Sequence, residues 1–269
     1  MKKSYVFWLI ISIISLSLVA CEKEQNQNNN SEDEEPDIEI INDAVTDIDG
    51  NHYNAVKIGN QVWMSEDLRT KRYADGTAIT VINIPGEPVS VDQSNPRLYI
   101  YNDRYYYDWP AVMNGSNYSI SNPSGVQGVC PSGWHVPSES EWDELVNYCK
   151  AYIQLQCDSC EECIGKALSS TSGWQSANGC PCCVGNHQGS NNATGFSAMP
   201  SGYVTYNPDG EVFAVEPGRK AMIWSASKDN QCVIVFGTDF SDSNFYSISA
   251  GGSNGLRESS GCPVRCVRD

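Results

Sequence analysis

Six cysteines lie close together in the middle of the chain, and their spacing suits two kinds of sulfur chemistry. They are Cys157, Cys160, Cys163, Cys180, Cys182 and Cys183. Four of them follow the pattern Cys160-x2-Cys163-x16-Cys180-x2-Cys183. This is the spacing of a zinc ribbon, in which four thiolates surround a tetrahedral ion. The alternative is a set of disulfides, so the interpretation depends on the compartment in which the protein folds.

The first residues indicate export. Lys2 and Lys3 form a short positive region, and an apolar run interrupted by serines extends from Val6 to Val19. This run is too short for a good permanent membrane span, and it ends in Leu18-Val-Ala-Cys21, which resembles a bacterial lipobox. We therefore interpret residues 1–20 as a lipoprotein signal peptide and Cys21 as the acylated first residue of the mature chain. The alternative is an ordinary secretory peptide that is followed by a cysteine.

A strongly acidic stretch follows the lipobox. Residues 22–43 contain nine acidic side chains and one lysine, with almost nothing apolar before Ile38. Such a stretch cannot bury enough surface to offset its ordering entropy, so we predict a disordered tether over residues 21–43. The whole chain has a formal net charge of −16, which argues against nucleic acid as a partner. The expected location is the outer membrane, facing the medium, with the lipid as the anchor.

Export favours disulfides over zinc, because exported thiols meet oxidants. With Cys21 assigned to lipid, an odd number of eleven cysteines is left. We predict no metal site in the cysteine-rich segment and cannot assign its connectivity from the sequence. The disulfide candidates are Cys130, Cys149, Cys157, Cys160, Cys163, Cys180, Cys182, Cys183, Cys232, Cys262 and Cys266.

Three short motifs match known functional patterns, but each has a simpler interpretation. Gly251–Gly255 fits G-x-S-x-G, yet the residues after it offer no helix, so a surface loop is favoured. Asp47–Asn51 resembles the start of a calcium loop but lacks the closing Glu, which favours a hairpin turn. Asn207-Pro-Asp209 resembles the triplets with which C-type lectins hold calcium and sugar, but its setting also favours a hairpin turn.

The histidines offer no catalytic arrangement. His52, His135 and His187 are far apart in sequence and have no metal-ligand spacing. His135 lies within Gly-Trp-His-Val-Pro, where we expect a packed, hydrogen-bonded side chain. The sequence also contains no phosphate loop, dinucleotide fingerprint or His-Glu-x-x-His motif. We therefore predict no enzymatic activity and no cofactor.

A run of aromatic residues extends from Tyr99 to Trp109. Rings with polar tips can stack on sugar faces or anchor a protein partner, so we name Tyr105, Tyr106, Tyr107 and Trp109 as candidate binding residues. The favoured interpretation is nevertheless that most of these rings pack in the core or in loops, with an exposed pair among Tyr105–Tyr107.

One helix and a series of short strands must position these residues. Ser138 and Glu141 form a capping box, and Trp142, Leu145, Val146 and Cys149 recur at helical spacing, which predicts a helix to about Ile153. Turn signals at 49–51 and 59–60 predict a small β-meander. Further strands are predicted at 97–101, 202–206, 211–215, 221–225, 232–236, 245–248 and 264–267.

Several motifs together resemble one known family. They are Asp49–Met64, Cys130–Ser138, Gly195–Tyr203, Trp224-Ser225 and Val264–Asp269, in this order. The pattern is similar to that of the Fibrobacter succinogenes major paralogous domain family, which is abundant in lipoproteins of Bacteroidota. Its helix-entry and Arg-Cys motifs are similar to those of C-type-lectin-like and formylglycine-generating-enzyme domains. The resemblance implies one disulfide-braced α+β domain over residues 44–269, C-type-lectin-like, with antiparallel sheets, few helices and long loops.

The resemblance also implies that Cys130 and Cys266 form a disulfide. Cys262 takes the place of an aromatic residue of the family, so we expect it to pair with Cys149, Cys232 or the cysteine-rich segment.

For function, the resemblance and the tether favour a lipid-anchored, non-enzymatic binding or adhesion protein with a glycan or protein ligand. One alternative is an oxidoreductase related to formylglycine-generating enzymes, which would use a cysteine pair with copper. A second alternative is a structural subunit of the cell envelope. A fold shared with either class does not decide between them.

The export hypothesis predicts a specific N-terminus. Mass spectrometry of the protein from native cells should find an acylated Cys21 as the first residue and oxidised cysteines in the remainder of the chain. An intact start methionine on soluble, fully reduced protein would contradict the hypothesis and would favour the zinc interpretation instead.

Overall fold

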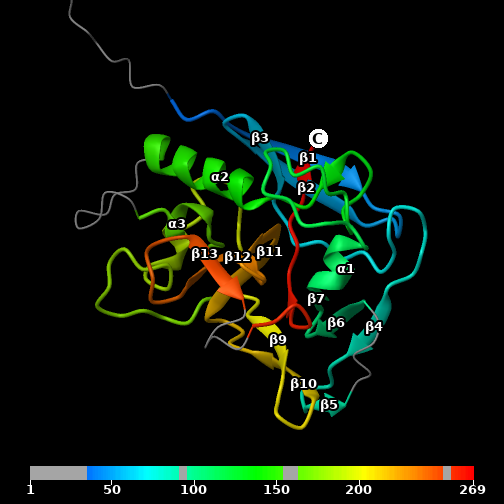
Figure 1. The fold of residues 1–269 in the computed structure, drawn as a ribbon. Coiled ribbons are helices and arrows are strands. Elements are labelled where there is room, and N and C mark those ends of the chain that lie inside the picture. Colours follow the sequence, from blue (N-terminus) through cyan, green and yellow to red (C-terminus); the bar gives the residue numbers. More distant parts are fainter. Residues whose placement is uncertain (1–34, 91–95, 154–162, 251–255) are drawn as a thin grey trace, which may run out of the picture. The chain divides into compact units, whose positions relative to one another are not determined.

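The strands of this protein form three sheets, and only a few short helices accompany them (Figure 1). The computed structural model describes residues 35–90, 96–153, 163–250 and 256–269. These residues belong to one compact unit that extends from Glu35 to Asp269. All strand pairs but one are antiparallel within the described residues, so the predicted class of antiparallel sheets with few helices is confirmed. No helix in these ranges is long and apolar enough to cross a membrane.

The first sheet contains the predicted meander and is completed by two distant segments. The turn at Asp47–Asn51 joins its first two strands, and Gly59-Asn60 joins the second to the third. Its strand order is β1 (Ile38–Thr46), β2 (His52–Ile58), β3 (Gln61–Met64), β15 (Val267–Arg268) and β8 (Trp134–His135).

The tether prediction was wrong at its C-terminal end. Residues 38–43, which we expected to be disordered, belong to β1 and pair with β2. The reason is that Ile38 and Ile41 pack against the core while the strand's backbone is hydrogen-bonded. The amide of Asp37 also donates to the Tyr148 hydroxyl at 2.7 Å.

The second sheet contains the aromatic run. Its β6–β7 hairpin turns at Asn102-Asp103, whose φ angles of 47° and 58° suit a tight two-residue turn. β4 runs parallel to β6. The order is β4 (Thr80–Asn83), β6 (Arg97–Tyr101), β7 (Arg104–Asp108), β14 (Gly261–Cys262), β9 (Tyr203–Tyr206), β10 (Glu211–Val215) and β5 (Val89–Ser90).

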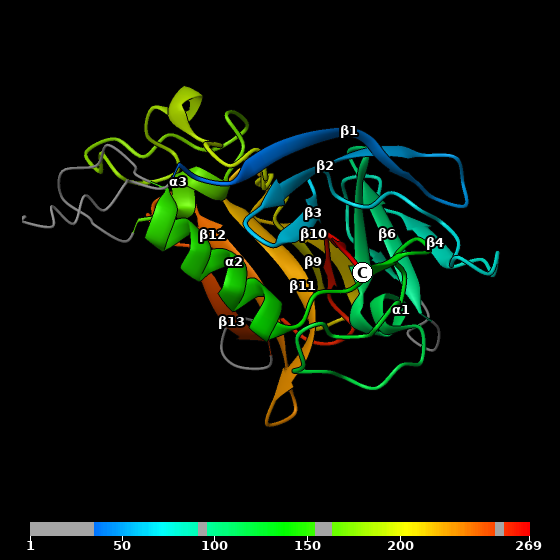
Figure 2. The same cartoon turned by 90° about the horizontal axis from the view of Figure 1, so that it is seen from above.

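The third sheet is a three-stranded ribbon of β11 (Lys220–Asp229), β12 (Cys232–Asp239) and β13 (Tyr246–Ala250). The remaining elements are α1 (Trp109–Met113), α2 (Glu139–Tyr152), α3 (Gly165–Leu168) and a 3₁₀ turn at Gln188–Ser190. Figure 2 shows α2 lying beside β11 and β12, with β2 and β3 nearby.

The predicted helix α2 is confirmed together with its capping box. The Ser138 hydroxyl accepts the Glu141 amide at 3.2 Å, and the Glu141 carboxylate accepts the Ser138 amide at 2.9 Å. The apolar face of the helix is anchored by Trp142, which lies 4.5 Å from the Trp63 ring and stacks on Phe236 at 5.2 Å. Because Trp63 is in β3 and Phe236 in β12, this ring cluster joins α2 to two sheets.

His135 is packed and hydrogen-bonded, as predicted. It is 3% exposed, and its ring nitrogens lie 2.6 Å from a Glu141 oxygen and 2.7 Å from an Asp269 oxygen. Burial opposes the charged imidazolium, but the hydrogen bonds and charges of the two carboxylates outweigh it, so the pKa of His135 is raised. The histidine therefore connects β8, α2 and the residue that follows β15.

The structure contains the Cys130–Cys266 disulfide that the resemblance implied. It also contains a Cys180–Cys183 disulfide, and Cys163 and Cys182 are disulfide-bonded as well. Cys180 and Cys183 are two of the four ligands that a zinc ribbon would need, so their bond favours the disulfide interpretation. Cys157 and Cys160 lie outside the described residues.

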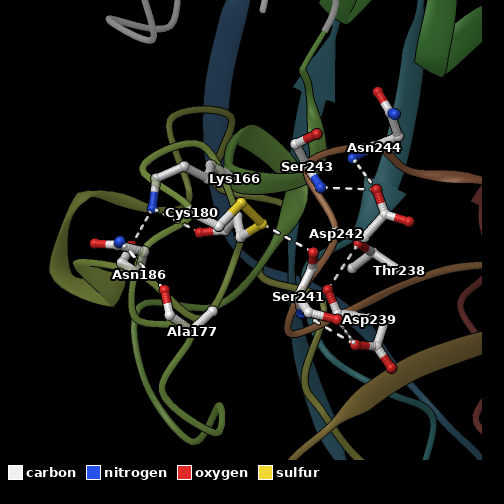
Figure 3. The surroundings of a disulfide bond; sticks show 11 residues. Lys166, Ala177, Cys180, Asn186, Thr238, Asp239, Ser241, Asp242, Ser243 and Asn244 are labelled. Atoms are coloured by element: carbon white, nitrogen blue, oxygen red, sulfur yellow. Dashed lines mark hydrogen bonds between the residues drawn. A yellow bond between two sulfur atoms is a disulfide. The ribbon is translucent and has the colours of Figure 1, made fainter. Parts of the chain in front are cut away.

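The short Cys180–Cys183 loop is held by two kinds of contact (Figure 3). The Cys183 sulfur lies 2.8 Å from the Ser241 carbonyl oxygen. The buried Lys166 ammonium donates to the carbonyl of Cys183 at 3.4 Å, and also to the carbonyl of Asn186 and the Asn191 side chain just after the loop. Burial lowers the pKa of Lys166.

The predicted pairing of Cys262 was wrong. Cys149, Cys232 and Cys262 are free thiols, so these three disulfide candidates are not bonded. Cys262 lies in β14 within the core of the second sheet, whereas Cys149 lies in α2 within the other large core, so their sulfurs cannot meet. Burial raises the pKa of the Cys149 thiol to about 12, which keeps it protonated and inert.

The Cys130–Cys266 disulfide should contribute strongly to stability, because it closes a loop with a sequence separation of 136 residues. A Cys130→Ser/Cys266→Ser double variant should lose about 3–5 kcal/mol of the free energy of unfolding, measured by guanidinium denaturation. Cys232→Ser, which removes a free thiol, is the matched control and should change stability by less than about 0.5 kcal/mol. Equal denaturation midpoints for the double variant and the parent protein would contradict this assignment.

Candidate binding site

The structure buries most of the aromatic side chains that we named as binding residues. Tyr106 and Tyr107 are 0% exposed and Trp109 is 7% exposed, so these three rings pack internally, as the favoured interpretation expected, and naming them as candidate binding residues was wrong. The reason for Tyr106 and Tyr107 is that β7 lies between β6 and β14, and the two rings pack in different core clusters. Trp109 begins α1 and packs in the same cluster as Tyr107. Their polar tips are satisfied internally, since the hydroxyls of Tyr106 and Tyr107 donate to the carbonyls of Ser201 and Thr70, each at 2.7 Å.

Tyr105 differs from its neighbours because it is only partly buried and lines an open pocket of about 260 Å³. Four segments far apart in sequence meet at this pocket. Its lining residues are Ser65, Glu66, Asp67, Leu68, Arg69, Asp103, Arg104, Tyr105, Ser197, Met199 and Arg265.

Arg265 forms the floor of the pocket. Its side chain is fully buried, and its Nε donates to an Asp67 carboxylate oxygen at 2.8 Å. Its two terminal nitrogens donate to the carbonyl of Phe196 and to that of Ser197, the latter at 2.7 Å. The guanidinium carbon also lies 4.6 Å from the centre of the Phe196 ring. One side chain therefore joins the C-terminal segment to two other segments of the lining.

One wall of the pocket is an ion pair between Arg69 and Glu66. Arg69 Nη1 lies 2.9 Å from Glu66 Oε2, and the guanidinium lies over the Tyr53 ring at 4.8 Å. Burial alone would raise the pKa of Glu66, but the Arg69 hydrogen bond and the Asn54 amide outweigh burial, so this pKa is lowered. The wall therefore presents fixed, ionised groups at neutral pH.

The opposite wall comes from the start of β7. Arg104 Nη1 donates to the Ser201 hydroxyl at 2.9 Å. Within the described residues Arg104 is in no ion pair, in contrast to Arg69 and Arg265. Its guanidinium has five donors in all, so it retains hydrogen-bonding capacity beside the Tyr105 ring.

The charges of the lining residues balance one another. Three arginines face three acidic residues, Glu66, Asp67 and Asp103. The lining contains no histidine and no cysteine. Rigid donors and acceptors next to an aromatic ring are suited to binding, by hydrogen bonds and stacking, of a small hydroxyl-rich group.

A second pocket of about 200 Å³ lies beside the Asp47–Asn51 turn. The Asp47 carboxylate is already satisfied by the Asp49 and Asn51 amides, the Asn51 side chain and the Tyr53 hydroxyl, at 2.6–3.0 Å. The hairpin-turn interpretation is therefore confirmed, and the carboxylate closes the turn.

The other motifs are accounted for in the same way. The Asn207 side chain accepts the amides of Asp209 and Glu211 at 3.0 and 2.8 Å, which confirms a hairpin turn. Gly251–Gly255 lies outside the described residues. No group of three or more histidine, cysteine or acidic side chains is arranged for a metal in the part of the chain that the structure describes.

Tyr105 is the one residue of this lining that we named from the sequence as a binding candidate. Asp67, Arg104 and Arg265 were not named as site residues, and Arg265 was visible only as part of the Arg-Cys ending. The only signal for Arg265 in the sequence was its position within this family motif, next to Cys266.

The family model of the Fibrobacter succinogenes major domain matches residues 56–268. The protein therefore belongs to this family. No curated protein and no solved structure matches the chain. The family match spans all four segments of the pocket lining.

Arg265 and Arg104 should differ sharply in their effect on stability. Arg265→Ala leaves the Asp67 carboxylate and two carbonyls without their donor, so it should reduce the free energy of unfolding by about 3–5 kcal/mol. Arg104→Ala, the matched control at the partly exposed wall, should cost less than about 1 kcal/mol. Chemical denaturation measures both, and similar losses in the two variants would contradict the role given to Arg265.

Proposed function

We propose that this protein is a non-enzymatic binding module of the bacterial cell surface, which is anchored by lipid at Cys21 and binds a glycan. The pocket beside Tyr105 takes one sugar residue of that glycan. The family membership and the lipobox support the cellular setting. A C-type-lectin-like relationship remains part of the proposal and rests on the helix-entry and Arg-Cys motifs alone.

The observation that carries the proposal is the composition of the pocket. Ion-paired arginines and carboxylates, an arginine with spare donors and a partly exposed tyrosine ring face one open volume of about 260 Å³. Sugars present hydroxyls around an apolar ring face, which matches fixed polar groups beside an aromatic ring. Pockets for drug-sized ligands occupy roughly 300–1,000 Å³, so this volume suits a single ring.

The oxidoreductase alternative receives no support from the described residues. It requires two thiols that face one cleft, but Cys266 is bonded to Cys130 and Cys262 is buried. The structural-subunit alternative is tested separately, by whether the purified protein self-associates in analytical ultracentrifugation.

A glycan array followed by isothermal titration calorimetry of the best hit tests the proposal. Arg104→Ala and Tyr105→Ala should each weaken binding about tenfold or more, because each removes a direct contact. Tyr246→Ala removes a tyrosine that is 40% exposed in β13, outside the pocket, and serves as the matched control. No signal on the array, or equal affinities for all variants, would contradict the proposal.

A further inference from the structure

Two large apolar side chains protrude from the loop that follows α1. Tyr118 is 58% exposed and Ile120 is 61% exposed, the two highest values among the large hydrophobic residues that the structure describes. Single exposed hydrophobic residues are common on protein surfaces, but two of them separated by one residue form a local patch. Neither residue lines the pocket proposed for glycan binding.

The loop is held in place where these side chains leave it. The amide of Ser119 donates to the Ala226 carbonyl at 2.9 Å, and the Ser119 carbonyl accepts the Ser227 hydroxyl at 2.6 Å. The carbonyl of Ile120 accepts the Ser140 hydroxyl at 2.8 Å. The loop is therefore fixed to both β11 and α2, and the exposure of the two side chains does not come from a loose backbone. Figure 2 shows this green loop beside α2 and the β11–β12 hairpin.

Acidic residues lie on the two elements that hold the loop, α2 and β11. The Ser227 hydroxyl that binds the loop also accepts the Glu139 amide at 2.8 Å, and Glu144 accepts the Asn122 side chain at 2.6 Å. Burial, together with the charges of Asp143 and Asp229, raises the pKa of Glu139. The exposed Asp143 and Asp229 are in no ion pair within the described residues.

The nearby lysine does not neutralise this acidic rim. Lys228 lies 2.6 Å from a Glu258 oxygen and 4.3 Å from the centre of the Trp109 ring, so its charge is already compensated. The surface around Tyr118 and Ile120 is therefore apolar at its centre and negative at its edge.

We propose that Tyr118 and Ile120 anchor a docking surface for a positively charged segment of a partner protein, in which lysines or arginines flank an apolar side chain. The apolar pair supplies burial and the acidic rim supplies attraction and orientation. A second copy of this chain is disfavoured, because its net charge of −16 would bring like charges together. An anionic membrane is disfavoured for the same reason. The surface is independent of the proposed glycan pocket.

Fluorescence anisotropy with two synthetic peptides and the full chain tests the proposal. One labelled peptide places leucine and tryptophan between lysines, and its partner has glutamates in place of the lysines. The lysine peptide should bind, more weakly as salt rises from about 50 to 300 mM, and the glutamate peptide should not. Tyr118→Ser/Ile120→Ser should weaken binding about tenfold or more, and Asp143→Asn/Asp229→Asn should weaken it severalfold at low salt.

Tyr246→Ser, which removes an exposed ring from β13, is the matched control and should bind as the parent does. Circular dichroism of each variant confirms that it is folded, since both substituted apolar residues are exposed. The proposal is overturned if the lysine peptide fails to bind at about 1 mM, or if both peptides bind equally. It is also overturned if Tyr118→Ser/Ile120→Ser leaves the affinity unchanged, or if that variant instead abolishes self-association of the chain.

Discussion

The buried guanidinium of Arg265 imposes the constraint on which the pocket depends. A charged group without solvent contact must find a carboxylate and further acceptors, because an unpaired buried charge costs several kcal/mol. Here Asp67 supplies the charge, and the carbonyls of Phe196 and Ser197 supply the remaining acceptors. Three segments, which are 68 to 198 residues from one another in sequence along these contacts, therefore meet around one side chain. Residues next to these contacts line the pocket.

The C-terminal segment that contains Arg265 also connects two of the three sheets. Within nine residues it contributes β14 to the second sheet and β15 to the first, so it belongs to both (Figure 1). Cys266 bonds this segment to Cys130, and Asp269 holds His135. Arg265 lies between these two strands in sequence. The same segment therefore supplies strands to two sheets and a residue to the lining of the pocket. Folding and site assembly are therefore linked.

Local patterns in the sequence predicted what is local in the structure. The capping box at Ser138 and the apolar spacing after it identified α2, and the Asp-Gly-Asn turn identified the β1–β2 hairpin. The resemblance identified the Cys130–Cys266 bond. Residue spacing did not reveal that β7 is an interior strand, so it could not show which rings of the aromatic run stay accessible. Residue spacing also did not show that Cys149 and Cys262 lie in different cores. It gave no indication that four segments far apart in sequence form one pocket.

Arginine side-chain NMR measures the central contact directly. The Nε–H of Arg265 donates to Asp67 at 2.8 Å in a fully buried setting, so it should give a sharp, slowly exchanging signal that persists at pH about 8. The Nε–H of the exposed Arg268 should exchange too fast to observe under the same conditions. Exchange of Arg265 as fast as that of Arg268 would show that its guanidinium reaches solvent, and would contradict the assembly of the pocket around it.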